Sequence, residues 1–235
     1  IDLDELSGAY DHRPITAAGR RRASLSASGL HGIAIDAGGG TGAHATVFSD
    51  LGMSPLVLDL NERMCAEASA SGVRAVRSRC ESMPLTNDSA TLAYFHLSIH
   101  YGDWVAALDE AVRVTEPGGR VEIWTFDRLA IERSPLARWF PTVGRIDAER
   151  FPDPQELAKH LGRRCSSVQI EAHDDLVDRR AGDWVAAVRS RFVSTLQLVS
   201  DAEIEAGIEA FNVDHPDPDE RYAHVLEYRR ISATV

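Results

Sequence analysis

The sequence has few cysteines and no long apolar run. Its three cysteines, Cys65, Cys80 and Cys165, show no paired spacing among 235 residues. This argues against a disulfide framework or a cysteine metal site and favours a reducing cytoplasm. No apolar stretch approaches the ~18 residues that cross a bilayer, and no signal peptide is recognisable. We therefore expect a cytoplasmic protein without membrane insertion or a bound metal.

Positive charge is also scarce. The chain has 25 Lys and Arg against 36 Asp and Glu, a formal net charge of −11. A nucleic-acid partner requires a basic face, so this balance argues against one. The run Arg20-Arg21-Arg22 is the local exception. We expect it to form a solvated helix face, with contact to an anion as the alternative.

The length and the 44% hydrophobic content suit one large domain. We expect a single domain over residues 1–235. Within it we expect an N-terminal helical segment (1–30), a ligand-binding core (31–130) and a variable part with the last strands and a helical lid (131–235).

Short apolar runs alternate with helical patterns along the chain. The runs that predict strands are 33–35, 55–59, 73–76, 90–95, 120–126, 166–172 and 221–232. The patterns that predict helices are 17–25, 44–51, 62–71, 103–114, 134–140, 153–161, 182–199 and 201–211. Such alternation predicts a parallel sheet that is covered on both faces and binds ligands at the carboxyl ends of its strands.

A glycine-rich loop follows the first predicted strand. Its residues run Asp36-Ala37-Gly38-Gly39-Gly40-Thr41-Gly42, and a predicted helix comes next. Glycines let the backbone approach a ligand, and the helix start offers free N–H groups. Asp59 ends the second strand, 21 residues after Gly38, where it can accept hydrogen bonds from a ribose diol. The alternatives are a tight turn without a ligand and an ordinary surface aspartate.

Four motifs in this order resemble those of class I S-adenosylmethionine-dependent methyltransferases. The glycine loop resembles D-x-G-x-G-x-G, and Glu81-Ser82-Met83-Pro84-Leu85 resembles E-x-L-P-F. The segment 96–101 resembles the stretch after strand four, and 112–119 resembles R-V-L-K-P-G-G. The most similar branch acts on small molecules and includes ubiquinone and menaquinone biosynthesis methyltransferases. The resemblance implies a Rossmann-like three-layer α/β sandwich with a seven-stranded, mostly parallel sheet, an antiparallel last strand and a helical lid insertion.

The resemblance also implies roles for individual residues. Around S-adenosyl-L-methionine it places Asp36, Gly38 and Gly40 at the methionine end, Asp59 on the ribose, Leu60 on the adenine face, Cys80 and Glu81 at the adenine edge, and His96 and Leu97 beside the amino group. Arg79 departs from the pattern, because many relatives carry an acid there. Arginine cannot accept a hydrogen bond, so the adenine amino group needs another acceptor.

Methyl transfer needs alignment more than acid–base chemistry. A general base is required only when the acceptor loses a proton, and His100 is the candidate because it follows strand four. A structural role is the alternative for His100. We expect the acceptor pocket to include Tyr10, Tyr101, Trp139 and Arg191, with core packing as the alternative for each.

The expected function is in-line transfer of a methyl group from S-adenosylmethionine to a small organic acceptor. The main alternative is an S-adenosylmethionine-binding fold without methyl transfer. A dinucleotide-dependent oxidoreductase is another interpretation, in which Gly38-x-Gly40-x-x-Ala43 is a variant of the dinucleotide-binding fingerprint. That interpretation does not account for the other motifs. The partner is expected to be a small molecule, with no nucleic acid, and homodimerisation is left open.

Overall fold

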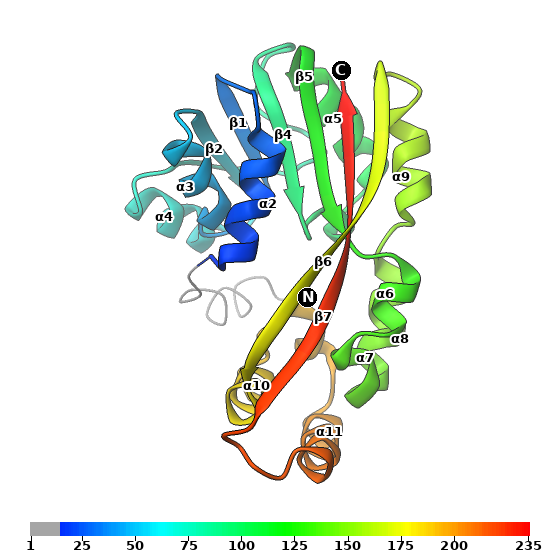
Figure 1. The fold of residues 1–235 in the computed structure, drawn as a ribbon. Helices are drawn as coiled ribbons and strands as arrows, with labels where there is room; N and C mark the ends of the chain where they lie inside the picture. Colours follow the sequence, from blue (N-terminus) through cyan, green and yellow to red (C-terminus); the bar gives the residue numbers. More distant parts are fainter. Residues whose placement is uncertain (1–14) are drawn as a thin grey trace. The chain divides into compact units, whose positions relative to one another are not determined.

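The computed structural model describes residues 15–235 (Figure 1). Contacts group them into two compact units. The larger unit contains residues 15–125, 152–172 and 229–235, and the smaller contains 126–151 and 173–228. The larger unit holds the glycine loop and all the strand ends at which the sequence predicts a cofactor.

One seven-stranded sheet has the order β3-β2-β1-β4-β5-β7-β6. Its strands are β1 (Ile33–Ala37), β2 (Ser54–Asp59), β3 (Arg74–Arg77), β4 (Ala90–His96), β5 (Thr115–Thr125), β6 (Ser167–Arg180) and β7 (Arg221–Thr234). Strands β1 to β5 pair in parallel, and β7 is antiparallel to β5. The Rossmann-like fold and its antiparallel last strand are therefore confirmed.

Side chains of the parallel strands alternate between two layers of helices. One layer contains α5 (Trp104–Val114) and α9 (Pro154–Leu161), which bury Leu58 and Phe95 in the main core. Val57, next to Leu58, instead packs with residues of α3 (Ala43–Asp50) and α4 (Glu62–Ala70). Successive residues of a strand point to opposite faces, so these apolar runs are buried on both sides.

Helix α2 (Ala17–Ala27) corrects the expectation for the arginine run. Arg20 lies on the surface and pairs with Asp50, but Arg22 is only 7% exposed. Residues two apart in a helix do not share a face, so a continuous charged run cannot be solvated throughout. The prediction of a solvated face is wrong for Arg22.

Inside the larger unit, a buried ion pair links β5 to β7. Glu122 is fully buried and accepts hydrogen bonds from Arg230 at 2.7 and 2.8 Å, and from the Ser232 hydroxyl at 2.7 Å. Arg230 lies almost opposite Glu122, two residues from its Cα partner Ser232. A register slip would break this buried ion pair, so the pair favours the observed alignment of the antiparallel strand.

The smaller unit has an aromatic core of Phe140, Trp184 and Phe211. Its helices are α6 (Arg128–Glu132), α7 (Pro135–Trp139), α8 (Pro141–Arg150), α10 (Ala181–Arg189) and α11 (Asp201–Asp214). The single helix predicted over 182–199 is wrong. Helix α10 ends at Arg189, Arg191 takes a left-handed backbone with φ 51°, and a 3-10 turn, η2 (Ser194–Leu198), follows. The Arg191 guanidinium satisfies the carbonyls of Leu196 and Val199, which stabilises the break.

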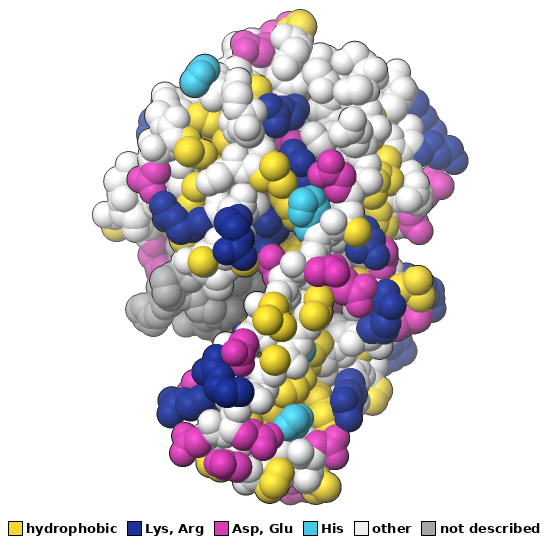
Figure 2. All heavy atoms as spheres, in the orientation of Figure 1, with side chains coloured by type: hydrophobic (Ala, Val, Ile, Leu, Met, Phe, Trp, Pro, Cys, Tyr) yellow, Lys and Arg dark blue, Asp and Glu magenta, His cyan; other side chains and the backbone are white. Residues whose placement is uncertain are grey.

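Within residues 15–235, no helix is both long and apolar enough to cross a membrane. No cluster of His, Cys, Asp and Glu in the same part of the chain could hold a metal ion. On the face shown in Figure 2, Lys and Arg side chains are interspersed with Asp and Glu in both units. That face carries no basic stripe of the kind that nucleic acids require.

Candidate functional site

The glycine loop requires glycine for steric reasons. Gly38 and Gly40 have φ angles of 67° and 56°, where side chains are strained. A Cβ atom on Gly38 would also lie 2.6 Å from the Cβ of Ser98. Ser98 in turn donates a 2.6 Å hydrogen bond to the carbonyl of Ala37. The loop after β1 and the segment after β4 therefore approach each other closely at one edge of the sheet.

Asp36 places an unsatisfied carboxylate oxygen beneath this loop. The residue is 1% exposed, and its Oδ2 has no hydrogen-bond partner among the described residues. Burial raises the pKa of Asp36 to about 7, an effect that the Ala45 backbone N–H partly offsets and the Asp59 charge increases. An orphaned carboxylate is suited to a cationic partner, so the pocket fits the amino group of an amino-acid ligand.

Asp59 also contacts the glycine loop. Its two carboxylate oxygens accept 2.9 Å hydrogen bonds from the backbone N–H groups of Gly40 and Asn61. Each oxygen has more than one acceptor position, so both can also accept from a diol. Burial raises the pKa of Asp59, while these backbone hydrogen bonds lower it. Leu60, the next residue, is 41% exposed and so can pack on a flat ring.

The loop after β3 borders the same region. The Cys80 thiol lies near the Gly38 N–H, and burial and neighbouring acids raise its pKa to about 12. Glu81 accepts a 3.1 Å hydrogen bond from the Asp103 N–H at the start of α5. Arg79, the residue that departs from the family pattern, is exposed and pairs with Glu81 at 3.3 Å. The Glu81 carboxylate is thus occupied by contacts with Asp103 and Arg79. We therefore expect backbone groups of this loop, rather than this side chain, to contact adenine.

His96 and Leu97 form the turn after β4. Leu97 has a φ of 52°, unusual for a residue with a side chain, and its N–H donates to the Trp124 carbonyl at 2.9 Å. Strained backbone of this kind concentrates at functional sites. The Nε2 atom of His96 accepts a 3.2 Å hydrogen bond from Arg22, and burial lowers the pKa of His96 well below its usual value.

Sequence reasoning missed two neighbours of this turn, Arg22 and His44. The His44 ring lies 4.3 Å from the His96 ring, and burial lowers the pKa of His44 to about 3. Both histidines are therefore neutral at physiological pH. His44 could have been found from its position, two residues after Gly42 at the end of the glycine loop. For Arg22, the helical periodicity of the predicted helix could have indicated a side chain that faces inward.

The predicted acceptor residues fall into separate parts of the chain. His100 and Tyr101 lie in η1 (Ile99–Tyr101) of the larger unit, with ring centres 4.3 Å apart. Trp139 and Arg191 belong to the smaller unit. Trp139 packs edge-on against Phe211 at 5.6 Å, and the donors of Arg191 reach two carbonyls and Asp201. Tyr10 lies outside the described residues.

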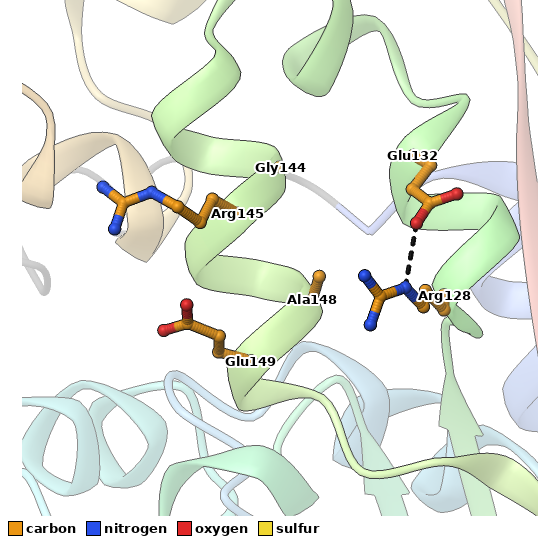
Figure 3. A pocket seen from close by; sticks show the side chains of 6 residues that line it. All are labelled: Arg128, Glu132, Gly144, Arg145, Ala148 and Glu149. Atoms are coloured by element: carbon orange, nitrogen blue, oxygen red, sulfur yellow. Dashed lines mark hydrogen bonds and ion pairs between the residues drawn. The ribbon is translucent and has the colours of Figure 1, made fainter.

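A shallow depression in the smaller unit lies between α6 and α8. Arg128 and Glu132 on its α6 side bond each other at 2.9 Å, while Arg145 and Glu149 extend from α8 away from them (Figure 3). Its charges are exposed and mixed in sign. Nothing in this arrangement converges on a ligand.

One family model matches part of the larger unit. Residues 35–123 match the family model described as "Methyltransferase domain". The match includes the glycine loop, Asp59 and the turn after β4. No curated protein matches the sequence.

Solved structures agree in fold at low identity. A putative methyltransferase from an antibiotic biosynthesis pathway of Anabaena variabilis is 19% identical, with a TM-score of 0.74 over 92% of this chain and 96% of that one. A putative methyltransferase from Bacillus halodurans is 17% identical, with a TM-score of 0.63 over 93% and 99%. Geranyl diphosphate C-methyltransferase from Streptomyces coelicolor, in complex with Mg²⁺, geranyl diphosphate and S-adenosyl-L-homocysteine, is 18% identical, with a TM-score of 0.54 over 99% and 93%.

Proposed function

We propose that this chain transfers a methyl group from S-adenosylmethionine to a small organic acceptor, because residues 35–123 match a methyltransferase domain model and the fold resembles that of a putative methyltransferase. The observation that carries this proposal is the pair of carboxylates, Asp36 and Asp59, next to the glycine loop. Asp36 has a buried oxygen that no described residue contacts through a hydrogen bond, and Asp59 has acceptor positions left after accepting from Gly40 and Asn61. These suit an ammonium group and a ribose diol, both of which S-adenosylmethionine carries.

The other site residues have supporting roles in this proposal. Gly38 and Gly40 let the backbone approach the methionine end, and the backbone at His96 and Leu97 meets the amino group. Leu60 packs on the adenine, whose edge meets the loop at Cys80 and Glu81. The thiol of Cys80 stays protonated because its pKa is raised to about 12, so it can donate a weak hydrogen bond.

The bound cofactor would supply an electrophilic methyl group on a sulfonium. A lone pair of the acceptor forms the new bond to the methyl carbon, and the carbon–sulfur electron pair leaves with sulfur. Orientation of the acceptor accounts for most of the acceleration that the protein can offer, roughly 7–11 kcal/mol in well-aligned reactions. His100 would remove a proton from an acidic acceptor. Tyr101, Trp139, Arg191 and Tyr10 are proposed to border the acceptor.

Two further proposals concern the whole chain. Residues 1–235 would act as one methyltransferase domain, in which residues 131–235 form the variable part that determines which acceptor binds. The odd number of cysteines supports a reducing cytoplasmic setting. The acidic net charge of −11 supports a small-molecule acceptor over a nucleic acid.

Calorimetry with S-adenosylmethionine and S-adenosylhomocysteine tests the proposal. We expect micromolar binding of both, and failure of both to bind below about 1 mM would refute it. An acceptor screen by product mass then tests turnover. Binding without methylation of any acceptor would favour a binding fold without transfer. His100→Ala should slow methylation of an acidic acceptor, and unchanged turnover would remove His100 as the base.

A further inference from the structure

The β6–β7 ribbon of the smaller unit, residues 173–180 and 221–228, exposes two large apolar side chains next to each other. Leu176 on β6 is 71% exposed, and Val225 on β7 is 46% exposed. The Ala181 N–H donates to the Glu220 carbonyl at 3.0 Å, and five residues from this bond on each strand Leu176 lies opposite Val225. Exposure alternates along both strands, so the two side chains share the outer face, on which Figure 2 shows hydrophobic side chains. They form the apolar centre of that face.

Charged side chains on the same face are sorted by sign. Counted from the same backbone bond, Asp174 lies opposite Glu227 on one side of the apolar centre. Arg180 lies opposite Arg221 on its other side. Like charges directly opposite each other in a strand pair repel, so each row is stabilised by charges of the other sign. An acidic row and a basic row therefore flank the apolar pair, and these six residues together are the ribbon face.

Exposed partners within the chain neutralise these two rows only in part. Three surface ion pairs do so: Arg180–Asp183 at 3.1 Å, Arg221–Asp178 at 2.9 Å and Glu227–Arg133 at 2.7 Å. Solvent-exposed ion pairs contribute little, because water and salt screen them. A second surface that shields the rows from water would strengthen their attraction for opposite charges.

The ribbon face is its own complement under a two-fold rotation. An axis that crosses both strands midway between the two rows brings the acidic row of one copy onto the basic row of the other. The axis passes next to Leu176 and Val225, so these side chains are buried against the second copy at the centre of the contact. An unrelated acidic or basic partner matches only one of the rows. A second copy of the chain matches both, and so it is the occupant that the charges specify.

We propose that the ribbon face binds a second copy of this chain and forms a two-fold dimer. The face is only two strands wide, at the small end of specific interfaces, so the dimer is weak. Its formation is independent of the proposed function, because the contact involves neither the glycine loop nor a cofactor.

Analytical ultracentrifugation of the full chain between about 5 µM and about 0.5 mM tests the dimer. We expect the mass to rise from 25.7 kDa toward twice that value. Leu176→Glu should weaken association at least tenfold, because it buries a charge at the apolar centre. Val213→Glu is the matched control, since Val213 is 79% exposed on α11, and it should change association less than twofold. A monomer at every concentration, or equal losses in the two variants, overturns the proposal.

A charge exchange tests the two-fold arrangement separately. Arg180→Asp places like charges opposite Asp174 of the second copy, so it should weaken the dimer at least fivefold. Adding Asp174→Arg to the same chain restores opposite charges across the axis and should return the affinity to within twofold of wild type. Circular dichroism checks that both variants fold. A double variant that associates as weakly as Arg180→Asp alone contradicts the two-fold contact.

Discussion

The carboxylate of Asp59 accepts a hydrogen bond from the backbone N–H of Gly40 over 2.9 Å. This contact joins the ends of β1 and β2 and holds the glycine loop against the predicted ribose position. The same oxygen pair also accepts from the Asn61 N–H that leads into α4. The protein thus orders the carboxylate before any ligand arrives, which lowers the entropy cost of binding.

Asp59→Asn should weaken binding of S-adenosylhomocysteine by about tenfold to a hundredfold, because hydrogen bonds to a charged acceptor contribute roughly 1.5–3 kcal/mol. Glu62→Gln is the matched control, since its side chain is 82% exposed and pairs with Arg77. Calorimetry measures both. An Asp59 variant with wild-type affinity would remove Asp59 from the ribose role.

The stability of the protein should fall as pH rises through the range in which Asp36 titrates. Its folded pKa of about 7 lies above the unfolded value of 3.8, so the folded state binds the proton more tightly. This contribution is fully present below pH 4 and is lost by about pH 7, an effect of about 4 kcal/mol. Asp36→Asn should abolish it. Urea unfolding of both proteins from pH 4 to 8 measures the difference, and parallel curves would contradict the prediction.

Cofactor binding should release a proton near neutral pH. Below pH 7 the Asp36 carboxyl is largely protonated, and an ammonium group favours the ionised form. Calorimetry at pH 6.5 in buffers of different ionisation enthalpy counts the protons. We expect net release by the wild type and none by Asp36→Asn. Equal proton counts in the two proteins would exclude Asp36 as the ammonium partner.

Gly38→Ala should destabilise the glycine loop far more than Gly52→Ala. Both glycines have positive φ angles, which cost a side chain roughly 1–2 kcal/mol. Only at Gly38 would the new Cβ meet another atom, at 2.6 Å, because the space around Gly52 is open. Unfolding free energies and S-adenosylhomocysteine affinity measure the effect. Equal losses for the two variants would show that backbone strain alone matters.

Glu122→Gln should lower the free energy of unfolding by about 3 kcal/mol, because it removes the fully buried partner of Arg230 and leaves that charge only the half-exposed Glu171, at 2.9 Å. Glu132→Gln removes the exposed partner of Arg128 and should cost about 0–1 kcal/mol. Chemical denaturation compares the two. A loss below 1 kcal/mol for Glu122→Gln would show that the buried pair is not needed for the β5–β7 alignment.

Local patterns predicted the larger unit well for physical reasons. Strands β1, β2 and β4 are largely buried and form nearly continuous apolar runs, and the unit's helix starts carry caps such as Asn61 and Asp103. The helices of the smaller unit were harder to predict. The break after α10 depends on a left-handed Arg191 whose bonds reach carbonyls later in the chain, and no local signal encodes such a contact.

The amino-acid sequence by itself determined the βαβ alternation, the glycine loop with Asp36, and an acid at the end of the second strand, because these depend on neighbouring residues. Only the tertiary structure decided how these groups interact. It brought the Gly40 N–H to the Asp59 carboxylate, turned Arg22 inward to His96, and paired Glu81 with Asp103 and Arg79. Each of these outcomes depends on burial and on contacts between segments distant in the chain. Burial and such contacts set the energy of a charge, and local sequence does not encode them.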